Sequence, residues 1–268
     1  MPEQPHMLRT PPHRRLAMAL AGARHRLVRG QPPAGEPLWT AVMTRWLVAA
    51  LVVAFIAGLA DDAVIRAVLG SQAATVRFMA WITNIGKSQW YLVPAGLIFL
   101  AVGLYDWSRS GARAKLRLAF LFGQAAYVFL AVASAGIFVD IVKVIAGRVR
   151  PIGIDRFGAW YFDPFSFSYS YASFPSGHSA TVGAVVGILM VWYPRWAIVI
   201  VEFGLFFAAT RIAAVAHYPS DVVTGFTVGV FFAIVIARWL ARRGVVFRLV
   251  PGKTLPVVSW FSPRKSIG

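Results

Sequence analysis

Six long apolar runs divide this chain, with polar or charged segments between them. Each run is close to the ~20 residues that a helix needs to cross a bilayer. They lie near residues 42–60, 88–106, 118–142, 177–194, 196–215 and 222–240. The segment 61–87 is only moderately apolar and carries five charged side chains, so it predicts one or two interfacial helices rather than a span. The pattern predicts an all-α integral membrane protein, a bundle of six transmembrane helices.

Both ends of the chain are polar and basic. Residues 1–41 hold six arginines and only two acids, and their apolar run at 16–23 is too short to span a bilayer. We interpret this segment as a cytoplasmic tail, either solvated or bound to lipid headgroups, rather than as a cleaved signal or transit peptide. Residues 42–240 carry no internal repeat and are predicted to form one six-span domain, followed by a second basic cytoplasmic tail at 241–268.

Composition agrees with membrane burial and excludes several classes of function. Hydrophobic residues make up 58% of the chain, and the mean hydropathy is +0.65. The chain has no cysteine, which excludes disulfides, a thiolate nucleophile and a zinc-thiolate site. The net charge of +17 lies mostly in tails and short loops, so we expect no nucleic-acid partner.

The loop charges predict the orientation. Both tails, the 107–117 loop and Arg195 are basic and fall on one side of a six-span arrangement. Since basic loops stay in the cytoplasm, both termini are predicted to be cytoplasmic in a bacterial inner membrane. The segments 61–87, 143–176 and 216–221 then face the periplasm, and that face holds every candidate site residue.

The stretch 171–180 carries the clearest chemistry. It places His178 where a polar loop ends and an apolar helical run begins. Free N–H groups and a positive dipole end favour an anion there, and Gly177 lets the anion approach the backbone. Basic segments before and after it, 143–150 and 211–217, would complete a pocket for a multiply charged oxyanion.

The spacing of the neighbouring residues supports one pocket. Lys143 and Arg150 are seven residues apart, about two helical turns, so both side chains could reach one point before Pro151 ends the helix. Arg211 and His217 are six apart and need a turn to meet, which the proline at 219 permits. Asp221 could cap the last helix or hold His217 in one tautomer.

Taken in order, these segments read Lys143-x6-Arg150-Pro151, then Pro175-Ser176-Gly177-His178, then Arg211-x5-His217-x3-Asp221. This closely resembles the three-part signature of the type 2 phosphatidic acid phosphatase family, which shares its site with the vanadium haloperoxidases. One departure is Thr210, where the family usually has a serine. Thr210 keeps the hydroxyl, so we expect phosphate contact to change only slightly.

The resemblance implies a role for each matched residue. His217 would attack phosphorus and form a phosphohistidine, Asp221 would orient and polarise it, and His178 would protonate the leaving oxygen. The phosphoryl oxygens would be bound by Lys143, Arg150, Ser176, Gly177 and Arg211. Because cations and a helix N-terminus supply the positive charge, we expect neither a metal nor another cofactor.

The expected function is therefore that of a membrane lipid phosphatase. Candidate substrates are phosphatidic acid, phosphatidylglycerophosphate, undecaprenyl diphosphate and a lipid A phosphate. Two alternatives stay open: a phosphotransferase that passes the group to another lipid, and a non-catalytic lipid-phosphate binding or transport protein. Headgroup selection is assigned to 61–87 and 152–172.

The surroundings of three further charged side chains are also predicted. Asp140 should pair with Lys143 one helical turn away. Arg148 is predicted either to contact a headgroup or to lie solvated in its loop. Glu202, an acid inside an apolar run, is predicted to contact Gln124.

Overall fold

The computed structural model describes residues 11, 14, 36–107 and 110–259, so most of the predicted N-terminal tail lies outside the described residues. The described helices are α2 Ala41–Leu59, α3 Asp61–Leu69, α4 Ala74–Ile82, α5 Gln89–Leu104, α6 Ala112–Ala146, α7 Ile154–Phe157, α8 Gly177–Trp192, α9 Ala197–Ala213 and α10 Pro219–Arg242. A 3₁₀ turn, η1 Thr83–Gly86, separates α4 from α5. Two short antiparallel strands, β1 Phe247–Arg248 and β2 Val257–Val258, follow α10.

Each of the six predicted apolar runs contains one helix. Among the described residues, five stretches are long and apolar enough to cross a membrane: Ala41–Leu59, Ala74–Leu104, Ala112–Ala146, Pro194–Ala213 and Pro219–Arg242. The helix in the remaining run, α8, is apolar but has only 16 residues. The segment 61–87 forms the short helices α3 and α4 and the turn η1. Its part from Ala74 onward falls within the candidate span Ala74–Leu104, which differs from the prediction that this segment contributes no span.

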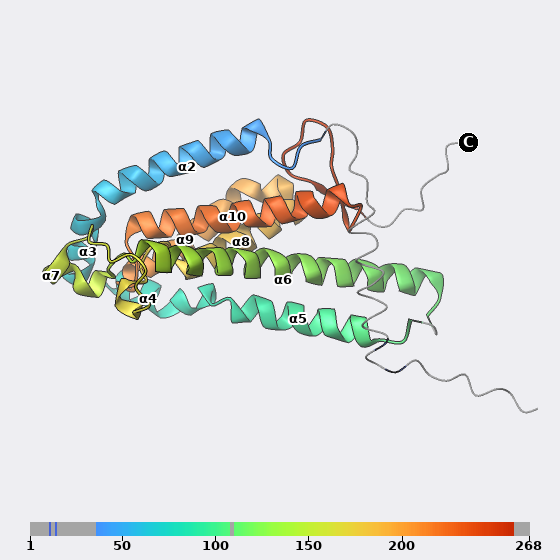
Figure 1. Cartoon of the computed structure of the whole chain (residues 1–268), viewed down its shortest axis with the longest axis horizontal. Coiled ribbons are helices and arrows are strands. Elements are labelled where there is room, and N and C mark those ends of the chain that lie inside the picture. Colours follow the sequence, from blue (N-terminus) through green and yellow to red (C-terminus); the bar gives the residue numbers. More distant parts are fainter. Residues whose placement is uncertain (1–10, 12–13, 15–35, 108–109, 260–268) are drawn as a thin grey trace, which may run out of the picture.

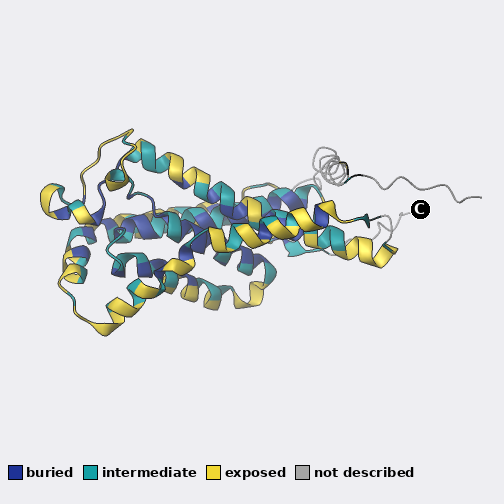
Figure 2. Cartoon of the chain, turned by 90° about the horizontal axis from the view of Figure 1, so that it is seen from below, coloured by how far each residue is buried: buried dark blue, intermediate teal, exposed yellow. Residues whose placement is uncertain are grey.

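The centre of the bundle is built by α6, α8 and α10. Their small and aliphatic side chains form one buried cluster, with Tyr127 of α6 and Phe247 of β1 packed edge to face at 4.9 Å. Helix α5 packs on α6, and α2 packs on α10 (Figure 1). Only 11% of α2 is buried, and Figure 2 shows exposed residues along the outer helices, as expected for surfaces that face lipid.

Glycines bring α8 and α10 into direct backbone contact. A Cβ atom on Gly225 would lie 2.3 Å from the carbonyl oxygen of Ser176, and one on Gly229 would lie 2.0 Å from that of Ala180. Small residues allow membrane helices to approach this closely. The two N-termini therefore lie side by side, and the Ser176 N–H donates to the Asp221 carbonyl at 3.0 Å.

Helix α6 ends earlier than the sequence pattern predicts. Gly147, with φ of +59°, caps it in the left-handed region, and a Cβ there would lie 1.7 Å from the Asp163 carbonyl oxygen. The prediction that Lys143 and Arg150 lie two turns apart on one helix is therefore wrong. Arg150 has extended backbone, as expected for the residue before Pro151, and its N–H donates to the Ser170 carbonyl at 2.8 Å.

The described part of the predicted C-terminal tail folds back onto the bundle. Val246 and Phe247 join the central cluster, and Val258 packs against it. Arg238 is fully buried near the end of α10 and donates to four carbonyl oxygens, those of Pro37 and Leu38 before α2 and those of Lys253 and Thr254 between β1 and β2.

Candidate active site

The predicted site residues gather at the end of the bundle that holds α3, α4 and α7 (Figure 1). They come from the C-terminal ends of α6 and α9 and the N-terminal ends of α8 and α10. The loop after α6 and the loop before α10 supply one residue each. The eight are Lys143, Arg150, Ser176, Gly177, His178, Arg211, His217 and Asp221.

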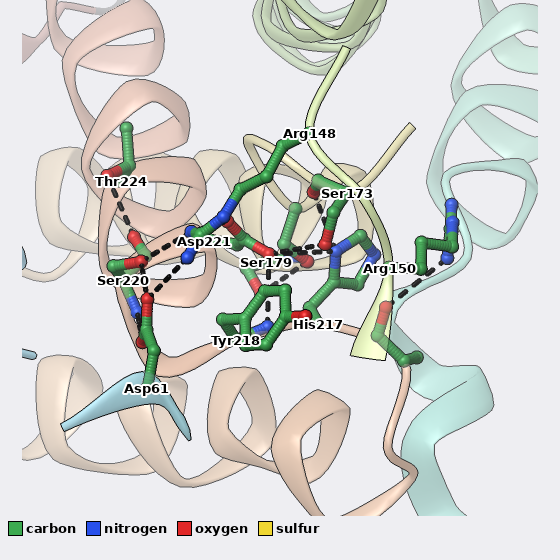
Figure 3. A network of polar contacts seen from close by, with 12 residues as sticks. Asp61, Arg148, Arg150, Ser173, Ser179, His217, Tyr218, Ser220, Asp221 and Thr224 are labelled. Atoms are coloured by element: carbon green, nitrogen blue, oxygen red, sulfur yellow. Dashed lines mark hydrogen bonds and ion pairs between the residues drawn. The ribbon is translucent and has the colours of Figure 1, made fainter. Parts of the chain in front are cut away.

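His217 is buried, and its Nδ1 is fixed by a backbone carbonyl. Nδ1 lies 2.8 Å from the Ser173 carbonyl oxygen and 3.7 Å from Oδ2 of Asp221 (Figure 3). Because a carbonyl oxygen can only accept, Nδ1 carries the proton and Nε2 keeps its lone pair. The sequence motif predicted Asp221 as the partner of the ring and did not predict this carbonyl. The carbonyl oxygen lies closer to Nδ1 than the Asp221 carboxylate does.

The surroundings keep His217 neutral. Burial, together with the charges of Arg150 and Arg211, lowers its pKa to about 4 against the opposing effect of Asp221. A neutral imidazole with a free Nε2 lone pair is the state that can attack phosphorus.

Asp221 is held from three directions. Its Oδ2 accepts from the Ser173 hydroxyl at 2.6 Å and from the Tyr218 N–H at 3.0 Å. Its Oδ1 accepts from Nη1 of Arg148 at 2.6 Å. Tyr218, not Asp221, is therefore the N-cap of α10, and Asp221 is the third residue of that helix. The Asp221 carboxylate also stays near His217.

The three predicted phosphate-binding cations surround this pair. Lys143 bonds to Asp140 at 3.0 Å, which confirms that predicted contact, and its Nζ would lie 3.0 Å from a Cβ on Gly177. A larger residue at 177 would therefore displace Lys143. Arg150 donates to the carbonyls of Tyr169 and Ala216, and burial lowers its pKa.

Arg211 has spare hydrogen-bonding capacity. Its Nη1 donates to the Thr83 hydroxyl at 3.0 Å, while its buried Nε has no partner in the described part of the chain. Thr210 donates to the Phe207 carbonyl at 2.6 Å, and its hydroxyl lies 3.1 Å from that of Thr83. The Thr210 hydroxyl therefore contacts the Thr83 hydroxyl that accepts from Arg211.

The first turn of α8 carries Ser176, Gly177 and His178. The Ser176 hydroxyl oxygen accepts from the Ser179 N–H at 3.3 Å and from its hydroxyl at 2.9 Å, so Ser176 is the N-cap of α8. A Cβ on Gly86 of η1 would lie 3.0 Å from Cβ of His178. The segment 61–87 thus forms one wall of the site, which the motifs did not indicate.

Two predicted environments are wrong. Arg148 is neither solvated nor free for a headgroup, because it is buried between Asp61 and Asp221. Glu202 is exposed, and Gln124 instead accepts from the Trp192 indole N–H at 2.9 Å. The described residues contain no cluster of three His, Cys, Asp or Glu side chains suited to a metal.

Known proteins resemble this chain in sequence. The sequence profile of the PAP2 superfamily matches residues 124–244, which include all eight site residues. A lipid A 1-phosphatase of Rhizobium johnstonii is 34% identical over 176 residues, which cover 63% of this chain and 70% of the relative. This chain belongs to the PAP2 superfamily. A second lipid A 1-phosphatase, from Rhizobium etli, is 33% identical over 176 residues, 63% of this chain and 73% of the relative.

The PAP2 protein also resembles one solved structure, a transmembrane PAP2-type phosphatidylglycerolphosphate phosphatase from Bacillus subtilis. The identity is 21%, the TM-score is 0.43, and the match covers 70% of this chain and 92% of the other. The family and both curated relatives identify this membrane protein as a phosphatase, a hydrolase of phosphoric monoesters.

Proposed function

We propose that this PAP2 protein removes the 1-phosphate of a lipid A-type lipid through a phosphohistidine at His217, without a metal. The observation that carries the mechanism is the buried, neutral His217 ring, with Nδ1 bonded to a carbonyl and cations around it. The similarity to two lipid A 1-phosphatases supports this substrate over the other lipid phosphates.

The proposed reaction has two displacements at phosphorus. Lys143, Arg150 and Arg211 bind the phosphoryl oxygens, together with Ser176 and the N–H of Gly177. Nε2 of His217 forms a bond to phosphorus as the bond to the lipid oxygen breaks, and that oxygen takes a proton from His178. Water then attacks phosphorus, gives a proton to His178 and returns the electron pair to Nε2.

The present contacts of the cations support phosphate binding. Among the described residues, Arg150 and Arg211 bond only to neutral carbonyl and hydroxyl oxygens, which a charged phosphoryl oxygen can replace with stronger bonds. A buried donor without a partner costs about 1–3 kcal/mol. An oxyanion that reaches Nε of Arg211 would remove that cost.

A shallow apolar groove on α6 supports a lipid substrate. It is mostly open to its surroundings and is lined by side chains of this one helix, Ile137, Asp140, Ile141, Val144 and Ile145. Asp140 pairs with Lys143, so the groove starts beside a proposed phosphate ligand. An acyl chain that lies along α6 would place its headgroup at Lys143.

The proposed membrane arrangement follows from the charge pattern. We place all six predicted spans, including the short α8, within one domain at 42–240 in the inner membrane. Both basic termini would be cytoplasmic, and the site would face the periplasm. The connection from α5 to α6 and the end of α10 lie opposite the site, which supports this orientation (Figure 1).

Phosphate release by the detergent-purified protein in EDTA tests the proposal. Lipid A should lose its 1-phosphate, observed by mass spectrometry, faster than phosphatidic acid, phosphatidylglycerophosphate or undecaprenyl diphosphate. His217→Asn should be folded but inactive. The asparagine amide can still donate to the Ser173 carbonyl oxygen, but it lacks the imidazole Nε2 that attacks phosphorus. Release that requires a metal, or a preference for another lipid, would contradict the proposal. Transfer of the group to a lipid hydroxyl would indicate the phosphotransferase.

A further inference from the structure

A buried cluster of charged side chains lies behind the nucleophile. It consists of Asp61 at the start of α3, Arg148 in the loop after α6, and Ser220 and Asp221 in the first turn of α10. Asp221 is the member of this cluster that approaches His217, with Oδ2 3.7 Å from Nδ1 (Figure 3). None of the other three residues belongs to the signature that binds phosphate.

Arg148 has no donor left for a substrate. It makes five hydrogen bonds, to Ser220, to both carboxylates and twice to the Ala159 carbonyl. A guanidinium has five N–H donors, so all are used. Its Cζ atom also lies over two aromatic rings, 4.3 Å from the ring centroid of Tyr218 and 5.1 Å from that of Trp160. Arg148 therefore acts through protein groups only.

Asp61 fixes the far side of this cluster. Its Oδ2 accepts from Nη2 of Arg148 at 2.7 Å and from the Ser220 hydroxyl at 2.5 Å. Its Oδ1 accepts from the Ser220 N–H at 3.0 Å. One carboxylate thereby orients both the guanidinium and the first turn of α10 that carries Asp221.

Arg148 holds both groups that face Nδ1 of His217. Its side chain donates to Asp221, and its backbone carbonyl accepts from the Ser173 N–H at 3.1 Å. Ser173 in turn supplies the carbonyl that Nδ1 contacts at 2.8 Å. A shift of Arg148 would move the two partners of the nucleophile together.

The charges of the cluster also suit the reaction. Phosphorylation at Nε2 turns the His217 ring into a cation, because Nδ1 keeps its proton. Asp221 and Arg148 alone form a neutral pair. Asp61 leaves the three groups with one net negative charge, buried where solvent screens it weakly.

We infer that Asp61 and Arg148 are positioning residues that orient Asp221 and Ser173 and stabilise the cationic phosphorylated ring of His217. This inference rests on the proposed function. It assigns α3, outside the signature, a direct influence on the rate of the chemical step. Neither residue touches the substrate, so substrate binding does not depend on them.

Asp61→Asn tests this assignment, and Asp62→Asn is its matched control. Asp62 is the next residue on α3 but forms an exposed pair with Arg66 at 2.7 Å. With lipid A as substrate, Asp61→Asn should lower kcat at least tenfold and leave KM within twofold, while Asp62→Asn should match the wild type. A wild-type kcat in Asp61→Asn, or a change confined to KM, would overturn the inference.

Two further variants separate this role from a loss of folding. Ser220→Ala leaves every charge in place and removes one shared hydroxyl, so kcat should fall a few-fold with KM unchanged; an unchanged kcat would count against the cluster. The double variant Asp61→Asn/Arg148→Met retains one net negative charge through Asp221. If Asp61 acts through Arg148, the loss of kcat in the double variant should be smaller than the product of the losses in Asp61→Asn and Arg148→Met, whereas multiplied losses would overturn the inference.

Anion binding tests the cluster without turnover. Orthovanadate bonded to Nε2 also makes the His217 ring cationic, whereas inorganic phosphate only occupies the cations. Calorimetry should show vanadate bound at least tenfold more weakly by Asp61→Asn than by Asp62→Asn, with equal phosphate affinity. Equal vanadate affinities would overturn the inference. A wild-type enzyme that releases no phosphate would instead refute the proposed function.

Discussion

Ser173 shows most clearly what a single residue adds to the sequence motifs. Its hydroxyl donates to Asp221, and its carbonyl accepts from His217. The motif spacing predicted His217 and Asp221, because their side chains define the chemistry. It could not predict Ser173, since any residue has a carbonyl and only the fold decides where it points.

The neutrality of His217 leads to a prediction about pH. Its pKa of about 4 lies below the value near 6.5 of a free histidine. Between these values the folded protein keeps His217 neutral while the unfolded chain is protonated. We therefore expect the free energy of unfolding to fall as the pH drops from 6.5 towards 4, and the nucleophile to stay unprotonated in this range.

NMR of isotopically labelled histidine measures this pKa directly, with His217→Asn to assign the signal. This readout avoids the second ionisation of a phosphomonoester, which lies near pH 6 and would shape a rate profile. Titration of His217 near 6.5 would contradict the buried environment described here.

At the scale of helices, the contact between α8 and α10 determines the geometry of the site. A Cβ on Gly225 would meet the Ser176 carbonyl oxygen at 2.3 Å, whereas a Cβ on Gly136 of α6 would meet nothing within 4 Å. Gly225→Ala should therefore separate the two N-termini and lower kcat at least tenfold. Gly136→Ala, also inside a helix, should keep full activity and add up to about 1 kcal/mol of stability. Equal activities would show that the contact tolerates a methyl group.

The groove on α6 gives a prediction about the lipid chain. Ile141 is 55% exposed in this groove, while Ile198, at the start of α9, is 76% exposed and lies outside it. Ile141→Gln should raise the KM for lipid A several-fold and leave hydrolysis of a short-chain, water-soluble phosphate unchanged. Ile198→Gln is the control and should change neither. Equal KM values for the two variants would exclude this groove as the acyl-chain site.

Helix positions were more predictable than helix ends. The apolar runs located α2, α5, α6, α8, α9 and α10, because lipid burial imposes a length and a composition. The sequence pattern placed the end of α6 at Pro151, because a proline cannot continue a helix, but the helix ends before Gly147. The left-handed glycine cap stops the helix before the proline can.

Across the whole molecule, long-range polar contacts escaped sequence reasoning. Asp61 is 87 residues from Arg148 and 159 from Ser220 in the chain. No periodicity links charges at such distances, and three-dimensional packing alone brings them together. The signature residues were predictable as a set because their order and spacing are characteristic of the family.

Arg238 provides a test of how the two ends of the described chain are held. It donates to carbonyls of Pro37 and Leu38 before α2 and of Lys253 and Thr254 after β1. Arg238→Met removes a fully buried side chain and leaves these four carbonyls without their donor, so the melting temperature should fall by several degrees. Because the site lies at the other end of the bundle, kcat at low temperature should stay within twofold of the wild type. A large loss of kcat with an unchanged melting temperature would contradict this structural role.

The most direct test of the central claim is to trap the phosphorylated enzyme. Wild-type protein mixed with lipid A carrying a labelled 1-phosphate is denatured at alkaline pH, where phosphohistidine survives, and its peptides are mapped by mass spectrometry. We predict phosphate on His217, bonded to Nε2 because Nδ1 is held by the Ser173 carbonyl, and none in His217→Asn. Phosphate on another residue, bonding through Nδ1, or turnover without any labelled histidine would contradict the account.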